Sequence, residues 1–272
     1  MDSSLLNKFD IDNCKFQFKN SPGFPHFCLD NFLDEEFALK IHDSFPSYKE
    51  AADVGVTYRA INEKRKVQVS DCMKYPTPIK KLYDLLVSKE FVALISEMSG
   101  IENLIADPNM SGGGIHATNT GGHLDVHIDF NYNEELALHR RLNLLIYFNK
   151  DWDEEFGGYL DLWDKDVKNC IGSFAPTFNR LAGFATGSFS WHGVTPINCP
   201  MDRMRKSFAI YYYTKEAPSG WDGIKHNTIF KARPKEHLKG KLLMPSEKLA
   251  HYLFQLIKKM IFSAKHLKNK LR

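Results

Sequence analysis

The chain has 272 residues, of which 43% are hydrophobic, 25% charged and 13% aromatic, and this composition excludes a disordered or fibrous protein. A chain of this length buries one sizeable core, so we expect a single domain with additions. The net charge of +3 is unevenly distributed, because residues 231–272 hold 12 lysine or arginine and 2 glutamate residues (+10), which leaves −7 for residues 1–230.

The N-terminal part, residues 1–111, is predicted to be a strand and helix region that supports the same domain. Residues 25–33 are typical of a short strand, and Asp34 is a candidate N-cap for the helix that follows. Helical periodicity returns over residues 78–98. We expect these helices to buttress a sheet.

The middle part, residues 112–230, is predicted to form the catalytic core. Short β-rich runs alternate there with Gly, Asn, Asp and Pro turns, which is typical of an antiparallel sandwich or jelly roll. The runs cover residues 142–148, 158–163, 180–184 and 207–214. The fold class is therefore predicted to be mainly β with flanking helices (α+β).

The last part, residues 231–272, is predicted to be a basic extension with an amphipathic helix over residues 246–271. This helix has two interpretations. It packs on its own domain with a solvated lysine face, or it contacts an anionic surface such as a membrane or an anionic substrate.

The cysteine pattern indicates whether the protein works in an oxidising or a reducing compartment. All five are scattered without a Cys-x-x-Cys pair, which argues against a disulfide framework and against a thiolate zinc site. Nothing at the start of the sequence resembles a signal peptide, and no stretch approaches the roughly 20 apolar residues that span a bilayer. We therefore expect a cytoplasmic protein, with peripheral membrane contact if the basic helix binds lipid.

A metal site is indicated by His127 and Asp129, which share one face of an extended strand. Two histidines and one carboxylate form the facial triad that leaves positions open on iron(II). The upstream pair His123 and Asp125 has the same spacing, and alternation along the strand does not separate the pairs. The later pair is favoured because it ends the strand just before a polar loop, residues 131–140. His123 is interpreted as a supporting or structural histidine.

The third ligand is predicted to be His192. It follows the apolar segment 181–189 and precedes a turn at Pro196, as expected for a strand that returns beside the first. Taken alone, His192 would be explained as a hydrogen-bonded core histidine. Together with the pair on the earlier strand it completes a triad.

A carboxylate anchor is predicted thirteen residues after His192, where Arg205 and Ser207 open a strand and share one face. A guanidinium and a hydroxyl placed in this way suit the distal carboxylate of a diacid. Arg203 is the alternative anchor, because it has the same parity and lies further into the turn.

A further polar face is predicted on the strand over residues 141–148. Asn143 and Tyr147 lie on one side of it, and polar groups inside a β-fold need partners. A bound cosubstrate would supply them, with Tyr147 donating to its distal carboxylate and Asn143 nearer the metal. From this segment alone, an ordinary half-exposed strand is an equal alternative.

Five blocks of the sequence, in this order, resemble the prolyl 4-hydroxylase-like branch of the iron(II)/2-oxoglutarate-dependent dioxygenase superfamily. They are His-Ile-Asp (127–129), Arg-Leu-Asn-Leu-Leu-Ile-Tyr-Phe-Asn-Lys-Asp-Trp (141–152), Gly-Gly-Tyr-Leu-Asp-Leu (157–162), Trp-His-Gly (191–193) and Arg-Lys-Ser (205–207). The resemblance implies a double-stranded β-helix, a jelly-roll barrel whose mouth holds the metal. It also implies that His127, Asp129 and His192 bind iron, and that Arg205 and Tyr147 bind the far carboxylate of 2-oxoglutarate.

The activity implied by the resemblance is hydroxylation of a C–H bond with release of succinate and CO2. The cofactors implied are Fe(II), 2-oxoglutarate and O2, with ascorbate as an optional reductant. Two alternatives stay open: an inactive metal-binding or 2-oxoglutarate-binding barrel that serves as an interaction module, and a zinc or iron hydrolase. The loop 130–140 is expected to form part of a lid that sets specificity. The substrate is left open among a protein residue, a free amino acid and a glycan or lipid.

Overall fold

The computed structural model describes residues 3–236 and 238–244. The helices are α1 (Ile11–Asn20), α2 (Glu35–Ser44), α3 (Tyr48–Val54), α4 (Thr77–Leu86) and α5 (Lys89–Ser99), with short 3-10 turns η1 (Ser3–Leu5), η2 (Cys72–Lys74) and η3 (Glu154–Phe156) and a π-helical turn η4 (Lys239–Leu243). The strands are β1 (His26–Leu29), β2 (Val56–Arg59), β3 (Glu63–Val69), β4 (Ile105–Ala106), β5 (Gly114–Ile128), β6 (Tyr132–Asn133), β7 (Leu138–Tyr147), β8 (Leu160–Trp163), β9 (Cys170–Phe174), β10 (Arg180–Ala185), β11 (His192–Val194), β12 (Met204–Thr214) and β13 (Ile229–Lys231).

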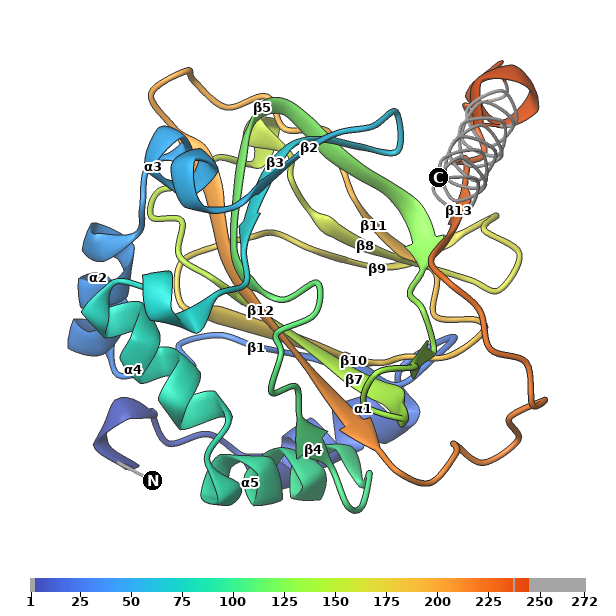
Figure 1. Ribbon diagram of the computed structural model, residues 1–272, viewed down its shortest axis with the longest axis horizontal. Coiled ribbons are helices and arrows are strands. Elements are labelled where there is room, and N and C mark those ends of the chain that lie inside the picture. Colours follow the sequence, from blue (N-terminus) through green and yellow to red (C-terminus); the bar gives the residue numbers. More distant parts are fainter. Residues whose placement is uncertain (1–2, 237, 245–272) are drawn as a thin grey trace, which may run out of the picture. The chain divides into compact units, whose positions relative to one another are not determined.

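The chain divides into two compact units, residues 1–230 and 231–272. In the first unit, strands in the order β1-β10-β7-β12-β5-β11-β8-β9 form an antiparallel sheet that curves into a nearly closed barrel (Figure 1). The short strands extend it, with β3 on β5, β2 on β3, β4 on β12 and β6 on β7. The predicted fold class, a jelly-roll barrel with flanking helices, is confirmed.

The two faces of β7 and β12 explain how the barrel is built. Leu144 on β7 pairs with Ile210 on β12, and both are fully buried in the main core together with apolar residues of α2, α4 and α5. Asn143 pairs with Tyr211 and belongs to the opposite face. Because successive side chains alternate between faces, one face packs on helices and the other lines the barrel interior.

The structure contains both predicted helical regions, divides the second of them, and adds α1 and α3, which were not predicted. Asp34 caps α2 as predicted, because its Oδ1 accepts a hydrogen bond of 3.0 Å from the Phe37 amide. The single periodic run over residues 78–98 is two helices, α4 and α5. Ser88 interrupts the run, because its hydroxyl accepts from the Phe91 amide and caps α5.

Strand β5 departs from the strict alternation that the sequence analysis assumes. Between Leu124 and His127 it advances three residues, while its partner β11 advances two from Val194 to His192. A β-bulge of this kind re-aims the side chains beyond it. The side chains of the pair 123/125 and those of the pair 127/129 therefore do not follow one uninterrupted alternation along the strand.

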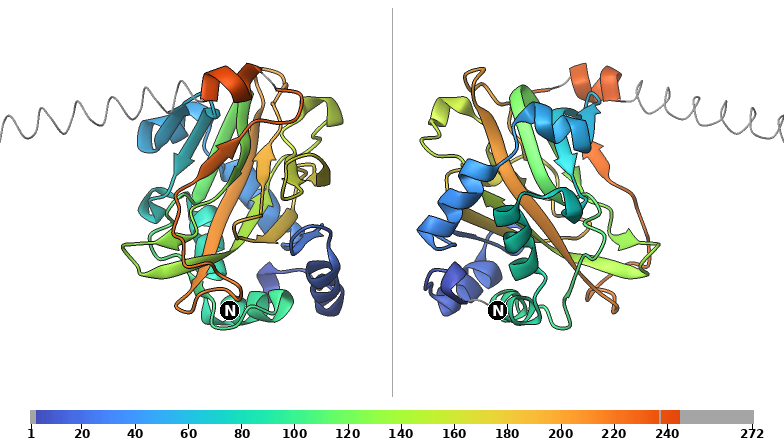
Figure 2. Two further views of the ribbon diagram at one scale, coloured as in Figure 1. Left: turned by 90° about the vertical axis from the view of Figure 1, so that its right-hand side faces the viewer. Right: turned by 60° about the vertical axis from the view of Figure 1, so that its left-hand side comes forward.

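After β12 the chain returns across the side of the barrel toward β13, which the left panel of Figure 2 shows facing the viewer. Residues 221–230 of this return are called the strap below. In the second unit the described part ends at Met244, so the helix predicted over residues 246–271 lies outside the described residues. Among the described helices, none has the length and apolar character required to cross a membrane.

Candidate metal centre

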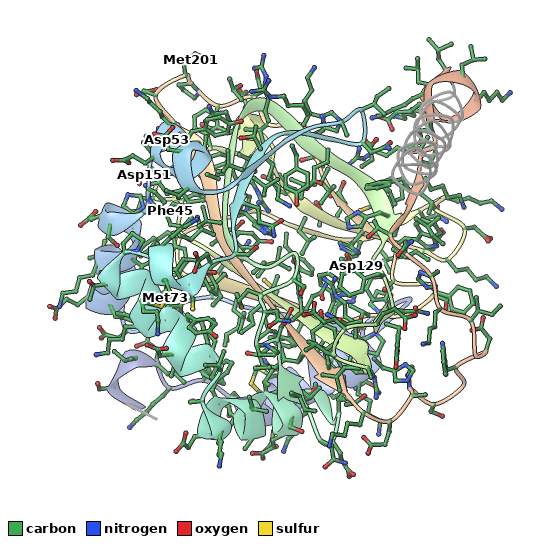
Figure 3. All side chains as sticks on the ribbon, in the orientation of Figure 1. Phe45, Asp53, Met73, Asp129, Asp151 and Met201 are labelled. Atoms are coloured by element: carbon green, nitrogen blue, oxygen red, sulfur yellow. The ribbon has the colours of Figure 1, made fainter. Side chains whose placement is uncertain are left out.

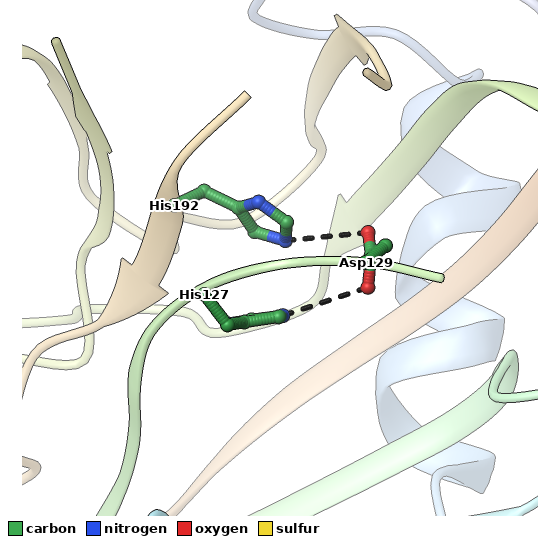
Figure 4. A group of neighbouring side chains, drawn as sticks. All are labelled: His127, Asp129 and His192. Carbon is green, nitrogen blue, oxygen red and sulfur yellow. Dashed lines mark ion pairs between the residues drawn. The ribbon is translucent and has the colours of Figure 1, made fainter. Parts of the chain in front are cut away.

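Two neighbouring strands bring the predicted metal ligands together. His127 near the end of β5 is the antiparallel partner of His192 at the start of β11, and their ring centroids lie 4.2 Å apart. Asp129 follows directly after β5, and its two carboxylate oxygens lie 3.5 Å from the Nε2 atoms of His127 and His192 (Figure 4). The candidate ligand atoms of all three residues lie within 4.8 Å of one another, which one metal ion can bridge.

Backbone carbonyl groups fix the orientation of both imidazoles. Nδ1 of His127 lies 2.9 Å from the carbonyl oxygen of Asp125, and Nδ1 of His192 lies 2.9 Å from that of Ser190. Because a carbonyl oxygen only accepts hydrogen bonds, each Nδ1 must carry the proton and each Nε2 keeps a free lone pair. Partners of this kind orient metal-binding histidines in proteins.

The electrostatic environment keeps His192 and Asp129 in the protonation states that a bound cation needs. Burial, followed by the neighbouring His127, lowers the pKa of His192 to about 3, so this imidazole is neutral. Burial alone would raise the pKa of Asp129, but Arg140 and the two histidines outweigh it and hold this pKa well below its usual range. Two neutral imidazoles and a carboxylate are the ligands of an iron(II) facial triad.

Arg205 and Tyr147 lie at another part of the same barrel interior. The Arg205 guanidinium is 3% exposed, donates from Nε to the Gly158 carbonyl oxygen at 2.7 Å, and donates from Nη1 to Ser207 Oγ at 3.2 Å. Its carbon lies 5.0 Å from the centroid of the Tyr147 ring. Burial raises the pKa of Tyr147 to about 12, with Arg205 opposing, so the hydroxyl keeps its proton and is a donor.

Two donors at this position have no partner. Within the described part of the chain, Nη2 of Arg205 and the hydroxyl of Tyr147 are buried without a hydrogen bond. Buried donors left unsatisfied are costly and call for an explanation. A carboxylate of a bound molecule would satisfy both.

The triad and Arg205 line one cavity of about 320 Å³. Its apolar lining includes Leu145 and Leu160, which suit the methylene groups of a dicarboxylic acid. Part of its polar lining comes from β3, where Glu63 and Lys66 form an ion pair of 2.7 Å. The cavity thus combines a metal-binding cluster, a carboxylate anchor and a polar wall.

Neither of the two alternatives weighed from the sequence replaces these residues, although His123 lines the same cavity. Nε2 of His123 lies 3.1 Å from the carbonyl oxygen of Ile61. His123 is not part of the metal cluster found among the described residues. Arg203 donates to the carbonyl oxygen of Asp151 at 2.7 Å and does not line the cavity. Figure 3 shows Asp151 well away from Asp129, beside the helices. The geometry therefore favours His127 and Arg205 over these two residues.

Asn143 lies beside the metal cluster, as predicted, but its amide is already occupied. Its Nδ2 donates to Asp129 Oδ2 at 2.8 Å, and its Oδ1 accepts from Nε of Arg140 at 2.9 Å. These contacts make it a partner of the carboxylate ligand.

Arg140 was missed by the sequence analysis. Its Nη2 lies 3.1 Å from Asp129 Oδ2, and the pair is almost fully buried. Strict alternation along β7 assigns Arg141, not Arg140, to the face of Asn143. The register of β7 against β12 shifts between Tyr212 and Tyr213, which skips Arg141 and turns Arg140 inward. Two adjacent arginines just after the polar loop were the only available signal.

The strap was also missed, because it has no periodic pattern. The Asn131 amide donates to the His226 carbonyl oxygen at 3.3 Å, and the His226 amide donates to Asn131 Oδ1 at 3.0 Å. The last strap residue, Phe230, lies with its ring centroid 5.4 Å from that of His127. The strap therefore forms part of the wall beside the metal cluster.

Comparisons with known proteins agree with this site. The model of the 2OG-Fe(II) oxygenase superfamily matches residues 113–213. Mouse prolyl 3-hydroxylase OGFOD1 is 29% identical over 207 residues, which is 70% of this chain and 33% of the relative, so the chain spans about a third of the length of that relative.

Solved structures show the same fold. A prolyl hydroxylase from Trichoplax adhaerens, solved with a peptide of hypoxia inducible factor, has a TM-score of 0.53 and 18% identity over 78% of this chain and 96% of its own. A Pseudomonas putida prolyl-4-hydroxylase has a TM-score of 0.53 and 13% identity over 75% of this chain and 98% of its own.

Proposed function

We propose that the chain is a member of the 2OG-Fe(II) oxygenase superfamily, whose model matches residues 113–213, and that it is an Fe(II)- and 2-oxoglutarate-dependent oxygenase that hydroxylates a C–H bond. One observation carries the proposal: a single cavity contains a two-histidine, one-carboxylate cluster and a buried arginine with an unsatisfied donor. The cluster fits ferrous iron, and the arginine fits the far carboxylate of 2-oxoglutarate.

In this proposal each residue has a defined task. His127, Asp129 and His192 hold Fe(II), while Arg205, supported by Ser207, and the Tyr147 hydroxyl bind and orient 2-oxoglutarate. When bound, the metal and cosubstrate would couple the oxidative decarboxylation of 2-oxoglutarate by O2, which yields succinate and CO2, to hydroxylation of the C–H bond. The protein contributes position and a water-poor cavity.

We propose a prolyl residue of a protein as the first substrate to test. Support comes from the names of the relatives, which are prolyl hydroxylases. Because the aligned relative is a prolyl 3-hydroxylase and the solved one a prolyl-4-hydroxylase, the position of hydroxylation is part of the test. A free amino acid and a glycan or lipid are the other substrate classes in the screen.

The test uses purified protein loaded anaerobically with Fe(II) and 2-oxoglutarate, with ascorbate as an optional addition. We expect succinate release that requires O2 and rises with a proline-containing peptide library, together with a mass gain of one oxygen in the peptide. Binding of 2-oxoglutarate without turnover over the whole substrate screen would favour the inactive module. Activity that persists without O2 would favour the hydrolase.

We propose further that the protein works in the cytoplasm and that its basic C-terminal part contacts anionic lipid surfaces. The five cysteines, which form no disulfide in the described part of the chain, and the excess of lysine and arginine after residue 230 support this. Deletion of residues 245–272 is expected to reduce co-sedimentation with phosphatidylserine vesicles. Unchanged co-sedimentation would rule out attachment through this segment.

A further inference from the structure

The barrel interior contains a buried ion pair between Arg140 and Asp129. The side chains are 2% and 12% exposed, and the Nη2–Oδ2 distance is 3.1 Å. Burying such a pair costs desolvation free energy that its attraction barely repays, so stability alone does not account for it.

The contacts on Asp129 are unequal between its two oxygens. Oδ2 forms the ion pair with Arg140 Nη2 at 3.1 Å, accepts a hydrogen bond from Asn143 Nδ2 at 2.8 Å, and lies 3.5 Å from Nε2 of His192. Oδ1 has one neighbour of this kind, Nε2 of His127 at 3.5 Å. Oδ2 is therefore held by two donors, whereas Oδ1 is left available to a metal.

Arg140 is itself held rigidly. Its Nε donates to Asn143 Oδ1 at 2.9 Å, and its guanidinium carbon lies 3.6 Å from the centroid of the Tyr211 ring and 4.8 Å from that of Phe130. Stacking on aromatic rings and a planar fork of donors suit arginine and do not suit lysine. The guanidinium is thus fixed in position before any metal binds.

We propose that Arg140 is a positioning residue that holds Asp129 by Oδ2, so that the carboxylate offers only Oδ1 to the metal. This rests on the proposed function, because a carboxylate that binds through one oxygen leaves a coordination position for the cosubstrate. Without Arg140 the carboxylate keeps only the hydrogen bond from Asn143, and the Asn143 amide loses its own partner on Arg140, so the carboxylate can turn and offer both oxygens. The position needed by 2-oxoglutarate is then occupied by the protein itself.

Replacing Arg140 should not lower the affinity for the metal, whereas a substitution that merely disrupts the site would lower it. In Arg140→Met the metal-free protein contains a buried carboxylate without its cation, and a bound divalent ion supplies the missing positive charge. Metal affinity is therefore expected to stay the same or to increase. A variant with a merely loosened site would bind metal more weakly.

The experiment compares Arg140→Met and Arg140→Lys with Arg141→Met as the matched control. Arg141 is the adjacent residue and donates to Thr214 Oγ1 at 3.0 Å, away from the metal cluster. Full-length proteins are titrated with Co(II) without O2, the visible Co(II) spectrum is recorded, and 2-oxoglutarate is then titrated in. The spectrum reports how many ligands surround the cobalt ion.

For Arg140→Met we expect Co(II) affinity at or above wild type, an altered Co(II) spectrum and 2-oxoglutarate affinity lowered about tenfold, which corresponds to about 1.4 kcal/mol. Arg140→Lys is expected to recover part of the loss, and Arg141→Met to match wild type. An unaltered spectrum with unchanged 2-oxoglutarate affinity, or Co(II) affinity lowered tenfold in both Arg140 variants, overturns the proposal. If Arg140→Met does not fold, Arg140→Lys decides on the same two criteria. Failure of wild-type protein to bind 2-oxoglutarate counts against the proposed function instead, and the Co(II) spectra still test the positioning.

Discussion

Replacement of Arg205 by methionine tests the carboxylate anchor most directly. Methionine keeps much of the length and apolar volume of the arginine stem but removes the charge and all donors. In the folded protein Arg205 already donates to Gly158 and Ser207, and its Nη2 is buried with no partner. The unsatisfied donor is the group that 2-oxoglutarate would use.

The expected loss follows from the number of bonds. A carboxylate that accepts from Nη2 and receives one further contact from the guanidinium loses two charge-assisted hydrogen bonds, each worth about 1.5 kcal/mol at the lower end of the usual range. The sum of about 3 kcal/mol corresponds to a dissociation constant for 2-oxoglutarate raised about a hundredfold. The ligand carboxylate would also remain buried without its cation, which adds to the loss.

The assay is calorimetric titration of 2-oxoglutarate into Co(II)-loaded protein without O2. Arg203→Met is the matched control, since this residue lies two positions earlier, donates to the Asp151 carbonyl oxygen and does not line the cavity. Its affinity for 2-oxoglutarate should be within a factor of about two of wild type. The reasoning is refuted if Arg205→Met binds 2-oxoglutarate within threefold of wild type, or if the two variants lose equal affinity.

Three further predictions concern the same cavity. Tyr147→Phe removes a buried hydroxyl that has no hydrogen-bond partner, so the metal-free protein should melt at the same temperature or slightly higher. The same variant should bind 2-oxoglutarate about tenfold more weakly. A lower melting temperature with unchanged 2-oxoglutarate affinity would contradict this prediction. His127→Ala should abolish tight Co(II) binding in an anaerobic titration and His123→Ala should retain it, so equal binding by both would show that the ligand assignment is wrong. Phe230→Ala opens the wall beside His127, so the rates of Co(II) binding and of Co(II) release to a chelator should both rise, with little change in Co(II) affinity. The control Phe16→Ala, at a position 67% exposed, should show the same rates as wild type. Exchange rates equal to wild type in Phe230→Ala would remove the strap from the wall of the site.

The fold could be predicted from the sequence where the spacing of apolar side chains directly reflects which face of an element is buried. The alternation over residues 141–148 correctly places Asn143 and Tyr147 on one face and Leu142 and Leu144 on the other, because one face lines the barrel interior and the other packs on helices. The cap at Asp34 was predictable for a similar reason, since a local hydrogen bond defines it. Periodicity alone did not show that Ser88 divides the run over residues 78–98 into two helices.

The clustering of the candidate ligands was predictable from the sequence, whereas their supporting contacts were not, and the roles of these residues stay predictions. His127, Asp129, His192, Arg205 and Tyr147 all lie where the spacing and the family resemblance place them. Arg140 was not found, because its inward orientation depends on a bulge near residue 141 that arises from strand pairing and leaves no mark in the local sequence. The strap was missed for a comparable reason, since its contacts with Asn131 join segments about 95 residues apart.

The carbonyl group that holds Arg205 belongs to Gly158, a residue with φ of +72°. A Cβ atom added there would lie 3.0 Å from Cδ of Arg205 and 3.1 Å from Cγ1 of Ile197, and the backbone conformation would itself be strained. The reach of the guanidinium into the cavity is thus set by a residue with no side chain. Selection among keto acids of different length therefore depends on a backbone position that contributes no reactive group, and even alanine at this position would shift the anchor relative to the metal.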